Sequence, residues 1–346
     1  MTKLIELTNI LKKVLEPPGP SGFEDEIREV ITSILSEWGL KPLEDAMGNV
    51  YVEYGEGKGE TLMITAHMDE IGLMVTGSDN KGRLYFTPLG GTPVSILESM
   101  HVKVKTSKGY IPGIIGIIPP HIRKGETQLK LEDLRIDIGA ESEDEIADLG
   151  VQPPTPAILE HKYIELRRGE IIAGRPLDDR VGVSLLLALA RYLSGLKPSR
   201  RIILAWTVQE EIGLKGAYAL AHKLNADYMI ALDTITCCKP PYTGGYTLGR
   251  GPVLRLIDRA YISCMPIARW VISTSKKEGI NLQVAAAQGG TDAAAGVHVG
   301  TCSTAITVAA ENSHSTVEKI YKRDLELTYE LLERLTDRFI AEGVKP

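Results

Sequence analysis

Residues 61–69 read Thr61-Leu-Met-Ile-Thr-Ala-His-Met-Asp69, a mostly apolar run that ends abruptly at a histidine. Such a run is typical of a central strand in an α/β sheet, because that strand is buried on both faces. Further apolar runs alternate with segments of helical periodicity, at 201–209, 228–232 and 304–309. This alternation predicts an α/β fold, with a mostly parallel sheet and helices on both faces.

The pattern of predicted secondary structure changes between about residues 71 and 163. Short β-like runs, such as 101–105 and 134–138, are separated by glycine-rich turns, and no long helical period occurs. This pattern predicts a small β domain whose core could close as a barrel. We expect residues 1–69 and 164–346 to form one domain, with residues 70–163 inserted into it.

The composition excludes several classes of protein. The net charge of −6 gives no sign of a nucleic-acid partner, and no apolar run approaches the length of about 20 residues that crosses a membrane. The N-terminus turns acidic at Glu6, too early for a signal peptide, so we expect a cytoplasmic protein. The four cysteines, Cys237, Cys238, Cys264 and Cys302, form no C-x-x-C pair, and we expect them to be reduced thiols.

Ser21-Gly22-Phe23-Glu24 has the pattern of a capping box, in which a serine and a glutamate three residues later cap a helix. Apolar residues at helical spacing follow as far as Trp38. A helix beginning at this box is therefore expected.

Histidine and acidic residues stand where predicted strands end or a helix begins: His67, Asp69, Asp178, Asp179, Glu210, Glu211, Asp233 and His314. In open α/β sheets, functional groups gather beyond the carboxyl ends of the strands. Two imidazoles and several carboxylates form the ligand set of a pair of divalent cations of the zinc type. Each motif alone is also explained by a cap or a solvated strand end, but together they indicate a hydrolase that activates water.

The spacing of these residues indicates which role each could have in metal binding and catalysis. His67 and Asp69 share one side of an extended chain, so Asp69 could fix the tautomer of the imidazole. Asp178 could bridge two cations, since ions about 3.5–4 Å apart need a shared anion. Glu210 and Glu211 point to opposite faces, so one could bind metal while the other acts on the water.

A glycine-rich turn, Gly289-Gly290-Thr291-Asp292, could present backbone N–H groups to a substrate oxygen. A tight turn capped by Asp292 fits this segment equally well. The sequence assigns no role to His121 or His298.

These motifs, in this order, resemble the tetrahedral, dodecameric aminopeptidases, the family of glutamyl and leucyl aminopeptidases with a two-metal site. The resemblance runs from about Gly19 to Glu318. The matching segments are 64–72, 174–180, 208–213 and 288–293, with 113–121 and 137–140 in the inserted region.

The resemblance implies a role for each motif. His67, Asp178 and Asp233 would hold one metal ion, and Asp178, Glu211 and His314 would hold the second, so that Asp178 bridges the two. Glu210 would be the general base, and Asp69 would orient His67. The ions would be Zn²⁺, or alternatively Co²⁺. The resemblance also implies a PDZ-like inserted domain and a hollow tetrahedral homo-oligomer of twelve subunits.

The function expected on these grounds is removal of N-terminal residues from short peptides by a metal-dependent aminopeptidase. The segment 234–245 contains no acidic residue, which favours substrates with a small or aliphatic neutral N-terminal residue. The second option is a preference for acidic N-terminal residues, which Lys239 could bind. Two departures from the family pattern put the side-chain preference in doubt. The stretch 234–249 is short, and 311–313 lacks an aromatic residue.

Three other functions are compatible with parts of the sequence. A deacylase or carboxypeptidase could share this ligand set, and Arg175, Arg180 or Arg250 could then hold a substrate carboxylate. A glycosidase is disfavoured because its two carboxylates must flank the sugar at about 5 Å or more, whereas adjacent Glu210 and Glu211 diverge. A non-enzymatic scaffold with a structural metal is disfavoured because structural zinc sites usually contain cysteine.

Overall fold

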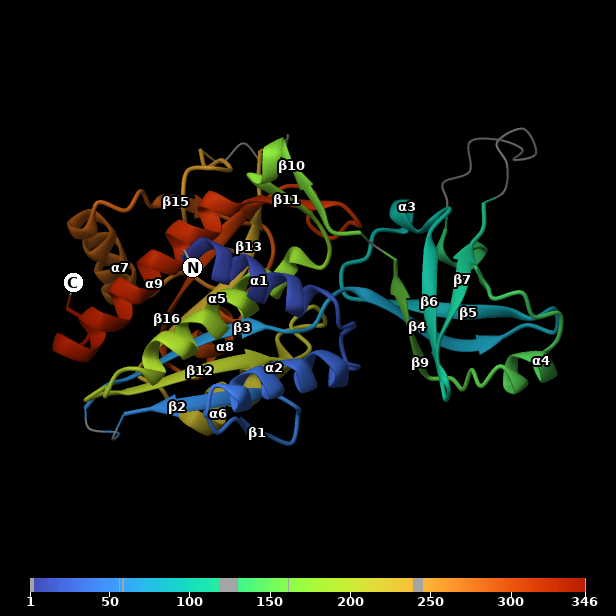
Figure 1. The fold of residues 1–346 in the computed structure, drawn as a ribbon, viewed down its shortest axis with the longest axis horizontal. Helices are drawn as coiled ribbons and strands as arrows, with labels where there is room; N and C mark the ends of the chain where they lie inside the picture. Colours follow the sequence, from blue (N-terminus) through green and yellow to red (C-terminus); the bar gives the residue numbers. More distant parts are fainter. Residues whose placement is uncertain are drawn as a thin grey trace.

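The structure, a computed structural model, describes residues 3–55, 57, 59–117, 130–160, 162–238 and 245–345. An α/β part and a β barrel lie side by side along the longest axis of the molecule (Figure 1). Both ends of the described chain belong to the α/β part, and the barrel is inserted between β3 and β10.

The α/β part is built on an eight-stranded sheet of order β1-β2-β12-β3-β13-β16-β14-β15. The strands are β1 (Leu43–Glu44), β2 (Val50–Tyr54), β3 (Thr61–His67), β12 (Arg201–Thr207), β13 (Tyr228–Thr236), β14 (Val253–Ile257), β15 (Gln283–Ala286) and β16 (Cys302–Ala310). The central strands β12, β3, β13 and β16 are parallel, as are β14 and β15. The remaining three pairings are antiparallel, so the sheet is mixed rather than mostly parallel.

Helices cover both faces of this sheet, as the sequence predicts. One face carries α1 (Lys3–Leu15), α2 (Asp25–Glu37), α5 (Leu177–Ser194), α7 (Met265–Glu278) and α9 (Lys322–Glu342), and the other carries α6 (Lys215–Leu224) and α8 (Ala293–His298). Side chains alternate along a strand, so Ile64 packs into the first core while Met63 packs into the second. No helix within the described ranges is long and apolar enough to cross a membrane.

The barrel closes through six strands in the order β4-β5-β8-β7-β6-β9, which confirms the expected closure. These strands are β4 (Gly72–Ser78), β5 (Arg83–Leu89), β6 (His101–Thr106), β7 (Gly109–Ile115), β8 (Ile136–Asp137) and β9 (Thr155–Leu159). Its interior is filled by apolar side chains such as Leu73, Val102 and Ile136. Short helices α3 (Val94–Leu97), η1 (Leu131–Asp133) and α4 (Glu143–Asp148) complete it.

A small sheet of three antiparallel strands follows the barrel in the chain. It contains β10 (Ile164–Leu166), β11 (Ile171–Gly174) and β17 (Glu318–Tyr321), with the short helix η2 (Arg167–Gly169) between the first two. Strand β11 leads directly into α5, and β17 leads into α9. The small sheet thereby joins two distant parts of the sequence.

The expected capping box is wrong. Helix α2 begins at Asp25, and neither Ser21 nor Glu24 caps it through a side chain. The Ser21 hydroxyl instead donates a hydrogen bond to Asp69 at 2.5 Å, and the Glu24 carboxylate accepts from the backbone N–H of Gln209 at 3.1 Å. Both side chains are buried and reach distant segments, although Glu24 also accepts a local hydrogen bond from the backbone N–H of Gly22 at 2.8 Å.

The expected reduced thiols are also wrong. Cys264 and Cys302 form a disulfide that joins the start of α7 to the start of β16, and Cys237 and Cys238 form a second one. The backbone N–H of Cys264 donates to the carbonyl of Ser303 at 2.9 Å, so the fold brings two segments together that are far apart in the sequence. Spacing alone could not show this approach.

Candidate functional site

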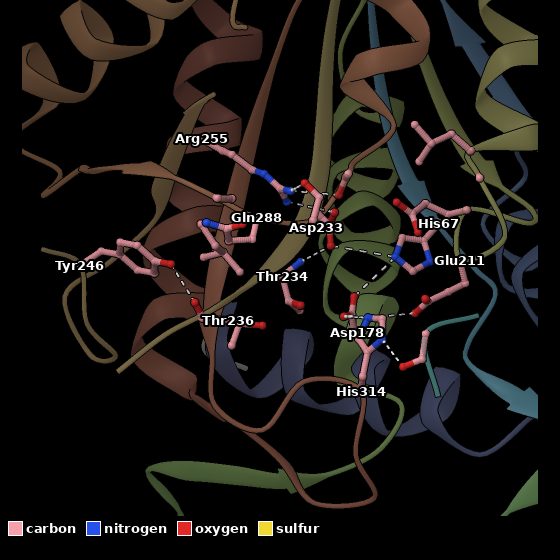
Figure 2. A pocket seen from close by; sticks show the side chains of 18 residues that line it. His67, Asp178, Glu211, Asp233, Thr234, Thr236, Tyr246, Arg255, Gln288 and His314 are labelled. Atoms are coloured by element: carbon pink, nitrogen blue, oxygen red, sulfur yellow. Dashed lines mark hydrogen bonds and ion pairs between the residues drawn. The ribbon is translucent and has the colours of Figure 1, made fainter. Parts of the chain in front are cut away.

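A cavity of about 560 Å³ opens where the central parallel strands end. Its walls include His67, Asp178, Glu210, Glu211, Asp233 and His314. Figure 2 shows the labelled imidazole and carboxylate side chains converging at one end of this cavity. The structure therefore brings together side chains from five separate parts of the sequence.

His67, Asp178 and Asp233 form the first cluster of potential ligands, here named the strand group. Each offers a ligand atom within 4.8 Å of the others. The Nε2 atom of His67 lies 3.5 Å from Oδ1 of Asp178 and 4.0 Å from Oδ1 of Asp233. All three side chains are almost fully buried.

Two members of the strand group, His67 and Asp233, lie on the neighbouring strands β3 and β13. His67 is the last residue of β3. Asp233 lies within β13 rather than at its end, because β13 continues along β16 as far as Thr236 after its pairing with β3 stops at Ala231. The predicted strand end at residue 232 is therefore wrong, although Asp233 still faces the cavity.

Asp178, Glu211 and His314 form the second cluster, named the loop group. The Nε2 atom of His314 lies 3.7 Å from Oδ2 of Asp178 and 3.6 Å from Oε1 of Glu211. Glu211 follows β12, and His314 lies in the turn between β16 and β17. Asp178 thus presents Oδ1 to His67 and Oδ2 to His314.

Asp69 is fully buried behind both groups. Its Oδ1 lies 3.5 Å from Nδ1 of His67, on the opposite side of the ring from Asp178. The same carboxylate accepts hydrogen bonds from the backbone N–H groups of Glu210 at 2.9 Å and Glu211 at 3.2 Å. Asp69 therefore contacts the His67 ring and also holds the backbone of the Glu210-Glu211 pair.

Glu318 is a functional candidate that sequence reasoning missed. It is buried at the first residue of β17, and its Oε2 accepts hydrogen bonds from the backbone N–H groups of Leu177 at 2.6 Å and Asp178 at 3.0 Å. Its Oε1 accepts from the backbone N–H of His314 at 3.1 Å. A lone glutamate before a short apolar strand carries no sequence pattern that would have marked this role.

Two other predicted motifs make structural hydrogen bonds, and Gly289 and Gly290 also line the cavity, so the presentation of their N–H groups to a substrate stays a prediction. Asp179 accepts a hydrogen bond from the backbone N–H of Gly182 at 2.9 Å, so it caps the regular part of α5. Asp292 accepts from the Thr207 hydroxyl at 2.6 Å, and the carbonyl oxygens of Gly289 and Gly290 accept from Arg255. His298 packs edge to face against Tyr218, away from the cavity walls, and His121 lies outside the described residues.

Burial and mutual repulsion hold protons on several carboxyl groups of this cluster. Burial, with repulsion from Asp178, raises the pKa of Glu211 and of Asp233 to about 7, and the pKa of Glu210 is raised well above its usual value by burial and by neighbouring carboxylates. For His67, burial acts to lower the pKa, but the charges of Glu210, Asp178 and Asp69 outweigh it and raise the pKa. The cluster therefore contains more carboxyl groups than can ionise together, and bound cations would favour their ionised form.

The chemistry of the donor atoms fits divalent cations. Imidazole nitrogen and carboxylate oxygen are ligands that zinc accepts, and each group offers three donors beside an open cavity. A carboxylate shared through its two oxygens is the arrangement that two adjacent cations require.

Comparison with known proteins identifies the family. The family model of the M42 glutamyl aminopeptidases matches residues 48–331. A lysyl aminopeptidase of Pyrococcus furiosus is 30% identical over 95% of this chain and 96% of its own, and a glutamyl aminopeptidase of Lactococcus lactis is 30% identical over 90% of each.

A solved structure of similar fold agrees with these relatives. The TET1 peptidase of Pyrococcus horikoshii, described as able to assemble into a tetrahedron or a large octahedral shell, is 39% identical. It covers 95% of this chain and 99% of its own, with a TM-score of 0.90. The resemblance expected from the sequence motifs is thereby confirmed, and the chain belongs to the M42 glutamyl aminopeptidase family, whose members are peptidases that remove N-terminal residues.

Proposed function

We propose that this protein removes N-terminal residues from short peptides with water activated by two divalent cations. The observation that carries the proposal is Asp178, whose two oxygens face His67 and His314 in separate ligand groups. Zn²⁺ is the first candidate for both ions, and Co²⁺ the second, since nitrogen and oxygen donors suit either. We propose that Asp69 orients the imidazole ring of His67.

Two bound cations would lower the pKa of a shared water and polarise the scissile carbonyl of the peptide. Glu210 belongs to neither ligand group but lines the same cavity, so its carboxylate is free to take the proton from that water. The same residue would then pass the proton to the leaving amine.

The choice between the two ends of a peptide depends on cations near the cavity. Arg175 and Arg180 are buried against Glu70 at 3.3 Å and 3.5 Å, outside the cavity walls, and Arg250 is exposed elsewhere. Arg255 is the one arginine or lysine among the described cavity walls. Whether a substrate carboxylate could bind to Arg255 therefore depends on the residues that Arg255 already contacts.

Arg255 is already engaged by acidic partners. Its Nη1 lies 3.7 Å from Oδ2 of Asp233, and its Nη2 lies 3.1 Å from Oδ2 of Asp258. A free ammonium group, in contrast, would enter a cavity rich in carboxylates, where Coulomb attraction favours it. This balance supports an aminopeptidase over a carboxypeptidase.

The cavity walls also bear on the preferred side chain. The part away from the two ligand groups includes Ile235, Thr236, Tyr246 and Ala287, which are neutral. We therefore propose small or aliphatic neutral N-terminal residues. Lys239, which would support an acidic preference, lies outside the described residues.

We further propose a homo-oligomer, with a dodecamer as the expected form, because the similar TET1 peptidase assembles into closed shells. In the same way, we propose that residues 70–163 form a PDZ-like inserted domain, with residues 1–69 and 164–346 as the catalytic domain. Light scattering after size-exclusion chromatography would measure the number of subunits.

A panel of matched peptides tests the proposed reaction. N-acetylation of a good substrate should remove most activity, while amidation of its C-terminus should change little. Substrates that begin with Gly, Ala, Leu, Glu or Lys, each assayed with Zn²⁺ and with Co²⁺, rank the side chains. Activity that survives acetylation but not amidation would indicate a carboxypeptidase, and fastest cleavage of the Glu substrate would favour the acidic preference.

A further inference from the structure

Glu318 connects two segments that are 136 positions apart at their ligand residues, Asp178 and His314 (314 − 178). Strand β17 places it there, because Glu318 pairs with Gly174 at the end of β11, just before the chain turns into α5. Its side chain is only 2% exposed, so no water competes freely for its oxygens. The carboxylate is therefore committed to the protein groups around it.

Three backbone N–H groups point at this one carboxylate. Leu177 and Asp178 donate to Oε2 at 2.6 Å and 3.0 Å, and His314 donates to Oε1 at 3.1 Å. The segments that donate these bonds are irregular. Asp178 has non-helical dihedral angles, and His314 has a positive φ of 59°, a conformation that a non-glycine residue rarely adopts unless its surroundings hold it.

We infer that Glu318 is a positioning residue that holds the backbones of Asp178 and His314 so that the loop group keeps the geometry of a cation site. The inference rests on the proposed two-metal function and deepens it. Glu318 is not among the residues that line the cavity, so its effect passes through the two ligand residues.

The effect should be selective for the loop group. His67 and Asp233 belong to β3 and β13, which the sheet itself holds, and the hydrogen bonds described for the Glu318 side chain go to Leu177, Asp178 and His314 instead. Apart from the carboxylates of Asp178 and Glu211, His314 has a contact of its Nδ1 with the carbonyl oxygen of Gly91 at 3.1 Å. Loss of the hydrogen bond from His314 to Glu318 would thus leave His67 and Asp233 held by the sheet and remove the backbone support of His314.

Glu318→Gln is the informative substitution, because glutamine preserves the shape but has only one acceptor oxygen. That oxygen can serve Leu177 and Asp178 or it can serve His314, but the amide NH₂ must then face a backbone N–H on the other side. We expect the oxygen to face Leu177 and Asp178, because that orientation keeps two hydrogen bonds rather than one, so His314 is the ligand residue that loses its anchor. Two donors facing each other also repel.

The experiment titrates Co²⁺ into metal-free protein and records visible absorption together with isothermal calorimetry. Wild type should bind two ions, and Glu318→Gln should weaken one of them by about 10–100-fold, the usual cost of losing an outer partner of a ligand. The other ion should bind as in wild type. At saturating Co²⁺ most of the kcat should return, since the ligands themselves are intact.

Glu311→Gln is the matched control. Glu311 lies in the same turn, and its carboxylate pairs with Lys319 at 2.6 Å rather than with the backbone of a ligand residue. The same Glu-to-Gln substitution at this position should leave the affinity for both Co²⁺ ions unchanged. Glu318→Asp provides a second variant if the glutamine variant does not fold: it keeps the charge but is one methylene shorter, so it should weaken the same ion by a smaller factor.

The outcomes are distinguishable. Two ions in wild type and unchanged binding of both in the Glu318 variants would overturn the inference alone. Equal weakening of both ions would also overturn it, because it would indicate general loosening of the fold. A wild type that binds fewer than two ions would contradict the proposed function, and the inference would fall with it. Selective loss of one ion, with an unaffected Glu311→Gln, supports it.

Discussion

The strand group and the loop group share Asp178 but are held by different kinds of structure. His67 and Asp233 stand on neighbouring parallel strands, and their side chains are 3% and 8% exposed. Glu211 and His314 stand on connections outside the sheet, and the side chain of His314 is 36% exposed. The two clusters offer similar donor atoms, so they differ in support rather than in chemistry.

This difference shows how a fold builds a site from unequal parts. Hydrogen-bonded register fixes the strand group, since the positions of β3 and β13 are set along their whole length. The loop group instead depends on two buried carboxylates, Asp69 beneath the backbone of Glu211 and Glu318 beneath that of His314. We therefore expect the loop group to bind its cation less tightly and to respond more to mutation.

Asp178→Ala should have the largest effect, because it removes a donor from both groups at once. Activity should fall below detection, and both ions should bind more weakly, since the two cations would lose their shared anion. Metal analysis of the purified variant, beside kinetics on a peptide substrate, checks this. Near-normal metal content would show that Asp178 is only part of a helix start, and the comparison of two linked groups would then fail.

Glu210→Gln should lower kcat by about 10²–10⁴-fold while both ions remain bound. The residue lies in the cavity but in neither ligand group, and its amide keeps the shape of the side chain. Turnover measured together with metal content separates the two roles. A variant that loses one ion yet keeps activity would exchange the assignments of Glu210 and Glu211.

The strand group was more accessible to sequence reasoning than the loop group. His67 and Asp233 both follow apolar runs, so hydrophobicity alone places them on buried strands. Glu211 also follows an apolar run, but the choice of Glu211 over Glu210 as a ligand, and the role of His314, needed the family motifs, because loop conformation has no simple periodicity. The function of Glu318 escaped both, since accepting backbone hydrogen bonds leaves no pattern in the sequence.

Long-range contacts account for the other differences between prediction and structure. Ser21 and Glu24 have the spacing of a helix cap, yet Ser21 donates to Asp69 and Glu24 accepts from Gln209, both from elsewhere in the chain. The direction of β14 relative to β16 likewise depends on how the chain returns to the sheet, which strand composition does not reveal. The Cys264–Cys302 bond also depends on such a return.

The two groups should also differ in how easily a chelator removes their ions, although this effect should be smaller than those of the substitutions above. A chelator titration should remove one ion first, at roughly tenfold lower chelator concentration than the second, if outer support sets the affinity. His314→Ala should abolish the early step, and His67→Ala should leave an ion that the chelator removes easily. Atomic absorption after dialysis gives the metal content at each step. Loss of both ions in a single step in wild type would contradict the unequal support.

Without metal, the two groups should behave alike, because their electrostatics are similar. The pKa values of Glu211 and Asp233 are both raised to about 7, mainly by burial, so the folded protein retains protons that the unfolded chain releases. Their contribution to stability is complete below the unfolded pKa values, about 4, and is lost as the pH rises through 7. His67, whose pKa is also raised, acts in the same direction, whereas the lowered pKa of Asp178, about 2, matters only in stronger acid.

The thermal midpoint of chelated protein should therefore fall by on the order of 5 °C between pH 5 and pH 8. Glu211→Gln and Asp233→Asn should each reduce this dependence by a similar amount, since each removes one carboxyl group that would ionise in that range. Scanning fluorimetry of both variants across the pH series makes the measurement. A much larger effect for Asp233→Asn would mean that the strand group also carries more of the buried charge, so that the groups differ in electrostatics as well as in support.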